Sequence, residues 1–228
     1  MLILRYRVLS MNDIPKRILV IAPHADDEVL GCGGYLLHCK KQGAEIELVI
    51  GTIGGTDIRQ DYSTRLGEFN SVCSRIDAKG SILFQHKDAV MDTIPSFEIT
   101  SRLDNIIDKF RPDEVFINYR SLHQDHIKMY ECALASCRLR EGYAPRLIAL
   151  YEYPFATTQV GPIGGGYMYH DISDCIDDKV SLFEEYATQI RKTPSPLNRN
   201  GIMALARIRG VECGVDYAEK FYVQKIMQ

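Results

Sequence analysis

The sequence predicts an α/β fold, a Rossmann-like three-layer arrangement in which helices flank both faces of a mainly parallel sheet. Two observations support this class. Short, continuous apolar runs rich in β-branched residues alternate with segments whose apolar residues recur at helical spacing. Hydrophobic residues make up 46% of the 228 residues and charged residues 25%, which is enough to build a large core without a disulfide or structural metal.

The first half of the chain begins with an expected strand over residues 17–22, which reads Arg-Ile-Leu-Val-Ile-Ala between two prolines. A continuous apolar run of this length is typical of a strand buried on both faces. We expect a helix over 28–42, ended by Gly43, and a second strand over 46–53. A glycine-rich loop at 51–57 and a helix over 62–76 follow, which together predict a repeating strand–helix order.

The second half continues the same alternation. We expect strands over 81–85, 114–118, 147–151 and 217–226, and helices over 97–110, 127–139, 177–190 and 202–211. The segment 154–166, rich in glycine and threonine, is expected to be a loop. Without an internal repeat or a convincing linker, we predict an N-terminal extension at 1–15 and a single domain at 16–228.

Composition excludes several classes of function. The formal net charge is −3, and basic clusters do not exceed two residues, which argues against nucleic-acid binding. No apolar stretch approaches the roughly 20 residues of a membrane-spanning helix, so we expect a cytoplasmic protein without a transmembrane segment. The seven cysteines are irregularly spaced and form no Cys-x-x-Cys pair, so we expect reduced, buried thiols. A homo-oligomer is compatible with this composition.

The strongest local motif is Pro-His-Ala-Asp-Asp-Glu at 23–28, placed where the first expected strand ends. Consecutive acids at the end of a buried strand are costly unless a cation lies near them. A helix N-terminus compensates only about 0.3–1 kcal/mol per charge. Helix capping accounts for Glu28, but it leaves His24 unexplained.

A second motif, His-Gln-Asp-His at 123–126, follows the fourth expected strand. The carboxyl ends of parallel strands meet at one edge of the sheet, where ligands bind, so the two motifs are expected to lie close together. Two histidines and a carboxylate around an open position are typical of a catalytic zinc site. Thiolate ligands are absent from both motifs, which favours Zn²⁺ and leaves Fe²⁺ or Mn²⁺ open.

These two motifs resemble those of the LmbE / PIG-L family of zinc-dependent N-acetylglucosaminyl deacetylases. That family opens with a Pro-His-Pro-Asp-Asp-Glu-type motif, in which Ala25 here replaces the second proline. Its later His-x-Asp-His motif matches residues 123–126. Weaker similarity covers Arg65 and Glu68, residues 111–113, 206–210 and 217–221. The resemblance runs from about residue 16 to residue 221.

The resemblance implies that His24, Asp27 and His126 are the metal ligands. It also implies that Asp26 is the general base beside the bound water. His123 is implied to stabilise the tetrahedral intermediate or to protonate the leaving amine. This is consistent with amide chemistry, because the metal polarises the carbonyl and lowers the pKa of water toward about 7, and a neighbouring carboxylate accepts the proton.

The resemblance further implies that Asp125 orients a histidine and that Arg65 contacts hydroxyl groups of the substrate. Asp88 matches a further polar contact, although Ala89 stands where the family has glycine. The implied substrate is a small molecule, an N-acyl amino sugar or a conjugate that contains N-acetylglucosamine. Nothing in the sequence selects one such sugar. The expected activity is hydrolysis of the N-acetyl group by a metal-activated water.

Alternatives from other classes remain. One is a Rossmann-like nucleotide-binding protein, since Gly31-x-Gly33-Gly34 opens a helix after a strand, but Asp26 and Asp27 would repel a pyrophosphate. Another is a non-catalytic sugar-binding relative, which would have no use for Asp26 beside the metal. A serine hydrolase is disfavoured because the chain lacks a Gly-x-Ser-x-Gly elbow.

Three further histidines, His38, His86 and His170, are expected to be ordinary surface or core residues. His86 ends the third expected strand, so it is the one to compare with the site. The tyrosines and glycines of 151–169 are expected to form a substrate lip.

Overall fold

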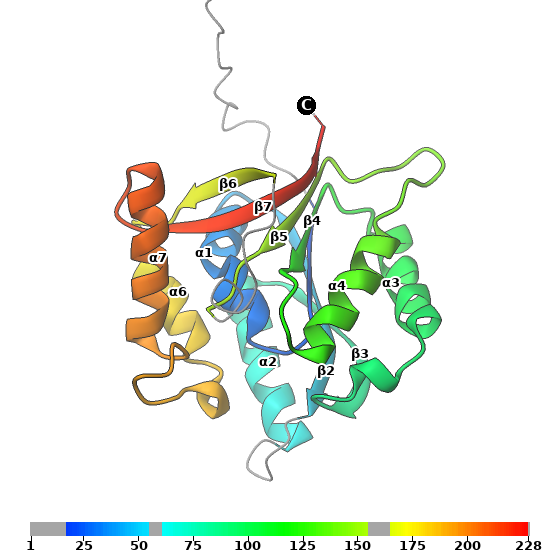
Figure 1. Ribbon diagram of the computed structural model, residues 1–228, viewed down its shortest axis with the longest axis horizontal. Coiled ribbons are helices and arrows are strands. Elements are labelled where there is room, and N and C mark those ends of the chain that lie inside the picture. The colour runs from blue at the N-terminus through cyan, green and yellow to red at the C-terminus, as the bar shows by residue number, and fades with distance from the viewer. Residues whose placement is uncertain (1–16, 55–60, 155–164, 228) are drawn as a thin grey trace, which may run out of the picture.

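A seven-stranded mixed sheet forms the centre of the protein (Figure 1). The computed structural model describes residues 17–54, 61–154 and 165–227. The strand order across the sheet is β3-β2-β1-β4-β5-β7-β6, and the first five of these strands are parallel. β7 runs antiparallel to both of its neighbours. The strands are β1 (Arg17–Ala22), β2 (Glu45–Gly54), β3 (Lys79–Lys87), β4 (Glu114–Asn118), β5 (Leu147–Tyr151), β6 (Gly166–Asp171) and β7 (Ala218–Ile226).

The central strands are buried on both faces, as their continuous apolar runs predict. In β1, Val20 lies opposite Leu48 of β2 and Phe116 of β4, and all three side chains are fully buried. This register aligns the carboxyl ends of β1 and β4 at one edge of the sheet. The two sequence motifs begin at that edge.

Helices cover both faces of the sheet, which confirms the predicted three-layer α/β class (Figure 1). α3 and α4 pack together on one face, and α1, α2, α6 and α7 lie on the other. The bounds are α1 (Asp27–Lys41), α2 (Tyr62–Ile76), α3 (Ser96–Phe110), α4 (Gln124–Ser136), α6 (Ile176–Phe183) and α7 (Arg199–Cys213). Two 3₁₀ turns, η1 (Met91–Thr93) and η2 (Ala187–Gln189), complete the described elements.

The glycines of α1 have a packing role. A Cβ atom on Gly31 would lie 2.1 Å from the ring of Tyr151, and one on Gly34 would lie 2.5 Å from the side chain of Ile172. Only glycine permits so close an approach of the helix to its neighbours. Close packing therefore accounts for these glycines, which weakens the nucleotide-binding interpretation.

The elements differ from the sequence expectation in three main places. The helix expected over 127–139 begins at Gln124 and ends at Ser136, so it includes most of the second motif. The helix expected over 177–190 ends at Phe183, after which Tyr186 turns into the core and donates its hydroxyl proton to Glu28. β6 was not among the expected strands, because its exposed and half-buried residues lack the apolar run of the central strands. Residues 1–15 and most of the loop expected at 154–166 lie outside the described residues.

No helix in the described ranges is long and apolar enough to span a membrane. All seven cysteines are free thiols, and Cys213 alone among them is exposed.

Candidate active site

The two histidine–carboxylate motifs meet at the carboxyl edge of the parallel strands. Residues 23–28 connect β1 to the first turn of α1, and residues 123–126 form the start of α4 after β4. Because β1 and β4 are neighbours in the sheet, the two helix N-termini lie side by side. The ring centroids of His24, His123 and His126 are separated by 5.2–5.3 Å.

Three groups converge as a candidate metal-binding set. His24, Asp27 and His126 each place one donor atom within 4.8 Å of the other two. Asp27 lies between the rings: its Oδ2 is 3.5 Å from His24 Nδ1 and 3.3 Å from His126 Nε2. These are the residues that the family resemblance implies as ligands.

His126 is suited to binding a cation. The residue is buried, and desolvation lowers the pKa of its imidazole to about 4, so the ring is neutral at neutral pH. Among the described residues, its Nδ1 atom has no hydrogen-bond partner. Asn118 fixes the start of α4 by donating its side-chain amide to the His126 carbonyl at 3.0 Å.

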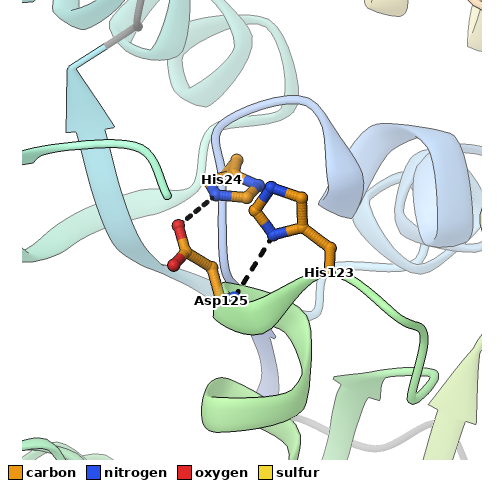
Figure 2. A group of neighbouring side chains, drawn as sticks. All are labelled: His24, His123 and Asp125. Carbon is orange, nitrogen blue, oxygen red and sulfur yellow. Dashed lines mark hydrogen bonds and ion pairs between the residues drawn. The ribbon is translucent and has the colours of Figure 1, made fainter. Parts of the chain in front are cut away.

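Asp125 holds His24 (Figure 2). Its Oδ2 lies 2.9 Å from His24 Nε2. The backbone N–H groups of Ala89 and Met91 donate to the same carboxylate at 2.6 and 2.9 Å. Burial alone would raise the pKa of Asp125, but the contact with His24 and these backbone bonds lower it below its usual value. A fixed, ionised Asp125 sets the tautomer of His24 and leaves Nδ1 facing Asp27.

The charge balance of the site favours a cation. Burial opposes protonation of His24, yet hydrogen bonds to Asp125 and Asp27 raise its pKa well above the usual value. Burial also opposes ionisation of Asp27, but its neighbours His126 and His24 lower its pKa. A divalent cation among these groups would satisfy the acids and the rings together, so the donor set fits a metal ion.

Asp26 is buried beside this set and stands outside it. Its side chain is not among the three groups that converge on a common point. Burial, reinforced by the adjacent charge of Asp27, raises the pKa of Asp26 well above its usual value. A carboxylate with a raised pKa is a stronger proton acceptor, which suits a general base.

His123 lies at the exposed side of the site. It caps α4, where its Nδ1 accepts the backbone N–H of Asp125 at 3.2 Å (Figure 2). Burial and the charge of His24 lower the pKa of its imidazole. A lowered pKa favours the neutral imidazole at neutral pH, so His123 can donate to a leaving nitrogen only after it has gained a proton.

Arg65 lies in the protein interior, with 1% of its surface exposed. Its guanidinium donates to Glu68 Oε2 at 3.1 Å and to the backbone carbonyl of Ala25. Contact between Arg65 and a substrate hydroxyl remains a prediction. The bonds to Glu68 and Ala25 show that the guanidinium also connects two parts of the protein interior.

Asp88 is half-buried and accepts the Thr52 hydroxyl at 3.1 Å, and burial raises its pKa. Its proposed contact with substrate stays a prediction. The next residue, Ala89, has a φ of 63°, in the region that favours glycine. This explains physically why a glycine stands at the corresponding place in the family motif.

Three residues near the site were not singled out as site residues from the sequence. Tyr153 stacks on His126 at 4.6 Å between ring centroids, and the fully buried Glu28 and Tyr186 pair behind Asp26. The sequence signal for these three residues was weak, because aromatic residues after a strand and acidic residues at the start of a helix are common. The side chain of His86 lies outside the described atoms, and of the expected lip, residues 155–164 are not described.

The comparisons with known proteins identify the family of the chain. A sequence profile of the PIG-L family, described as GlcNAc-PI de-N-acetylase, matches residues 19–137. That range is half of the chain and contains both motifs. The chain therefore belongs to the PIG-L family, as its motifs predict.

Individual relatives are more distant. A 1D-myo-inositol 2-acetamido-2-deoxy-alpha-D-glucopyranoside deacetylase from Mycobacterium sp. (strain JLS) is 22% identical, with 81% of this chain and 78% of the relative covered. A solved N,N'-diacetylchitobiose deacetylase from Pyrococcus horikoshii superposes with a TM-score of 0.75 at 24% identity, covering 94% of this chain and 85% of that one.

The same fold also carries other chemistry. A 4-carboxy-2-hydroxymuconate hydratase from Pseudomonas putida superposes with a TM-score of 0.76 at 17% identity, covering 93% of this chain and 98% of that one. Likeness at this identity shows the fold alone. The activity is therefore argued from the family and from the site residues.

Proposed function

We propose that the protein is a zinc-dependent N-deacetylase that hydrolyses the acetamido group of an amino sugar or of a conjugate containing N-acetylglucosamine. The observation that carries this proposal is the convergence of His24, Asp27 and His126, with Asp26 and His123 beside them. Membership of the PIG-L family supports the hydrolytic deacetylase activity. The mycobacterial relative's amino-sugar substrate supports the substrate class.

His24, Asp27 and His126 would hold the cation. When bound, a divalent cation there polarises the amide carbonyl and lowers the pKa of a water molecule toward about 7. Asp125 keeps His24 in one tautomer through the 2.9 Å contact at Nε2. The burial of Asp27 and His126 excludes bulk water and strengthens the electrostatic interactions within the site.

Asp26 and His123 divide the proton transfers. The buried Asp26 carboxylate, with its raised pKa, accepts the proton of the attacking water. The exposed His123, in its protonated imidazolium form, donates a proton to the sugar nitrogen as the amide bond breaks and is left as the neutral imidazole. Acetate and the free amino sugar are the products.

The decisive experiment is mass spectrometry of N-acetylated sugars incubated with metal-free protein and with protein reloaded with Zn²⁺, Fe²⁺ or Mn²⁺. We expect the loss of one acetyl group from at least one sugar, restored best by Zn²⁺. The panel includes free N-acetylglucosamine, its disaccharide and its inositol and malate conjugates. Stoichiometric metal with no deacetylation of any panel member would contradict the proposed activity.

A further inference from the structure

Asp26 has an unusual backbone conformation. Its φ of 148° and ψ of −31° lie in a region that residues with a side chain rarely adopt. The residue stands between β1 and α1, and its carbonyl accepts the N–H groups of Val29 and Leu30 in the first turn of the helix. Such a conformation costs free energy and persists only where the surrounding structure imposes it.

Glu28 contacts this backbone from one side. Its Oε2 accepts the backbone N–H of Asp26 at 3.0 Å, and its Oε1 accepts the hydroxyl of Tyr186. Both Glu28 and Tyr186 are fully buried. A carboxylate in the protein interior that faces a backbone N–H two residues earlier holds that N–H in a set direction.

Arg65 contacts the same backbone from the other side. Its Nη2 donates to the carbonyl of Ala25, and its Nη1 donates to Glu68. The Ala25 carbonyl and the Asp26 N–H are the two polar groups of one peptide unit. A hydrogen-bond acceptor and a hydrogen-bond donor therefore hold opposite ends of that peptide, which fixes its rotation and with it the φ of Asp26.

A single distant segment supports both contacts. Tyr186 bonds Glu28, and two residues later Thr188 donates its backbone N–H to Glu68 at 2.7 Å. Thr188 also donates its hydroxyl to the other oxygen of Glu68 at 2.7 Å. The turn at 186–188 therefore positions Glu28 and Arg65 relative to each other. It bonds Glu28 directly, and it holds Arg65 through Glu68.

We propose that Glu28 and Arg65 are positioning residues that clamp the Ala25–Asp26 peptide and so hold the Asp26 carboxylate in place to accept a proton. The role of Asp26 as base rests on the proposed function. The backbone conformation of Asp26 is an observation that does not depend on the proposed function. A displacement of about 1 Å in a reacting group lowers the rate on the order of 10²-fold, so the orientation of this peptide matters to turnover.

Kinetics separate the clamp from sugar binding by Arg65. Arg65→Met keeps much of the side-chain volume and removes every donor, and Glu28→Leu removes the acceptor. Each is expected to lower kcat on the order of 10²-fold while KM and metal content stay close to wild type. A raised KM at unchanged kcat in Arg65→Met would instead show contact with the substrate and overturn the clamp.

A conservative variant and a matched control sharpen this test. Glu28→Gln keeps an oxygen that accepts from Asp26 and offers an N–H to the Tyr186 oxygen, so it should recover most of the kcat lost in Glu28→Leu. Arg75 is on the same helix as Arg65 and contacts Ser181 and Glu185, away from the 25–26 peptide. Arg75→Met should retain wild-type kcat, and an equal loss there would overturn the specific role of Arg65.

A crystal structure gives a result that does not depend on activity. In Arg65→Met or Glu28→Leu, the φ of Asp26 should move to negative values. A φ that stays near 148° in both variants would overturn the clamp, even if the wild-type enzyme deacetylates sugars. Should these variants fail to fold, Tyr186→Phe removes one hydroxyl and should lower kcat several-fold at constant KM, whereas unchanged kcat would count against the clamp.

Discussion

Helix α1 has a cluster of histidine and carboxylate near each end. Near its N-terminal end lie His24, Asp27 and His126, and near its C-terminal end His38 contacts His170 and Asp174. Residues 27 and 38 are about 16 Å apart along the helix. Each cluster places three donor atoms within 4.8 Å when Cys175 is counted with the second.

The C-terminal cluster is already satisfied by its own hydrogen bonds. His38 uses both ring nitrogens, Nδ1 toward His170 Nε2 and Nε2 toward Asp174 Oδ1, each at 2.8 Å. The Asp174 side chain is 72% exposed, so water solvates its charge. Burial raises the pKa of Cys175 to about 12, which keeps it a thiol and a poor ligand.

The N-terminal cluster differs in the number and burial of its charges. Three consecutive acids are buried there, and the His126 ring, neutral at neutral pH, places its Nε2 3.3 Å from Asp27 Oδ2. Buried charges in native proteins are normally paired or bound to a metal, so this cluster calls for a cation, whereas the exposed Asp174 in the other cluster does not. Residue types alone do not separate the two clusters, whereas burial and bonding do.

The largest expected effect separates the two clusters by metal content. His126→Ala should lose the bound metal and lower kcat by about 10³-fold or more, because a catalytic cation contributes several kcal/mol to the transition state. His38→Ala should keep one metal per chain and wild-type turnover. Elemental analysis and kinetics on the same preparations measure both. Equal metal loss in the two variants would break the distinction.

The next effect concerns proton transfer at the N-terminal cluster. Asp26→Asn preserves size and removes the proton acceptor, so kcat should fall about 10²–10⁴-fold while metal content stays at wild type. Single-turnover kinetics and metal analysis check this. Loss of the metal would make Asp26 a ligand, and activity within a few fold of wild type would reduce it to a charge that balances the site.

A smaller effect concerns the support of His24. Asp125→Asn should weaken metal affinity or activity about 10–100-fold, because a carboxylate partner fixes the ligand's tautomer. Competition with a metal chelator measures the affinity. Asp174→Asn is the matched control, since Asp174 has the same contact with His38 at the other cluster. The metal affinity of Asp174→Asn should equal that of wild type. A similar loss of affinity in both variants would mean that the effect of Asp125→Asn does not come from its contact with His24.

The smallest effect tests backbone strain next to the site. Ala89 has a φ of 63° and is held by its N–H bond to Asp125 at 2.6 Å. Ala89→Gly removes about 1–2 kcal/mol of strain from the left-handed conformation in the folded state. The greater entropy of glycine in the unfolded state offsets about 0.4–1 kcal/mol of that gain, so the free energy of unfolding should rise by less than about 1.5 kcal/mol. Denaturant titration measures it, and a destabilised variant would show that the strain is absent.

Much of the fold was predictable from local sequence. Continuous apolar runs indicated buried parallel strands, and β1, β2, β4 and β5 lie at or close to the expected ranges. The edge strand β6 and the short α6 were mispredicted, because exposed strands and early helix ends depend on packing partners elsewhere. The division into an extension at 1–15 and a domain at 16–228 stays a prediction, as does cytoplasmic location.

From the sequence by itself, the family resemblance of the two motifs predicted the candidate ligand set, and the order of strands and helices determined the edge of the sheet where the motifs lie. The motifs at 23–28 and 123–126 lie between a buried strand and the start of the next helix, and the patterns that predict such strands and helices are local properties of the chain. Only the tertiary structure decided how the base is held. Glu28 meets Tyr186, and Arg65 reaches the Ala25 carbonyl, across long separations in the chain. The direction of a side chain toward a distant partner depends on how the whole core packs, and no local pattern encodes it.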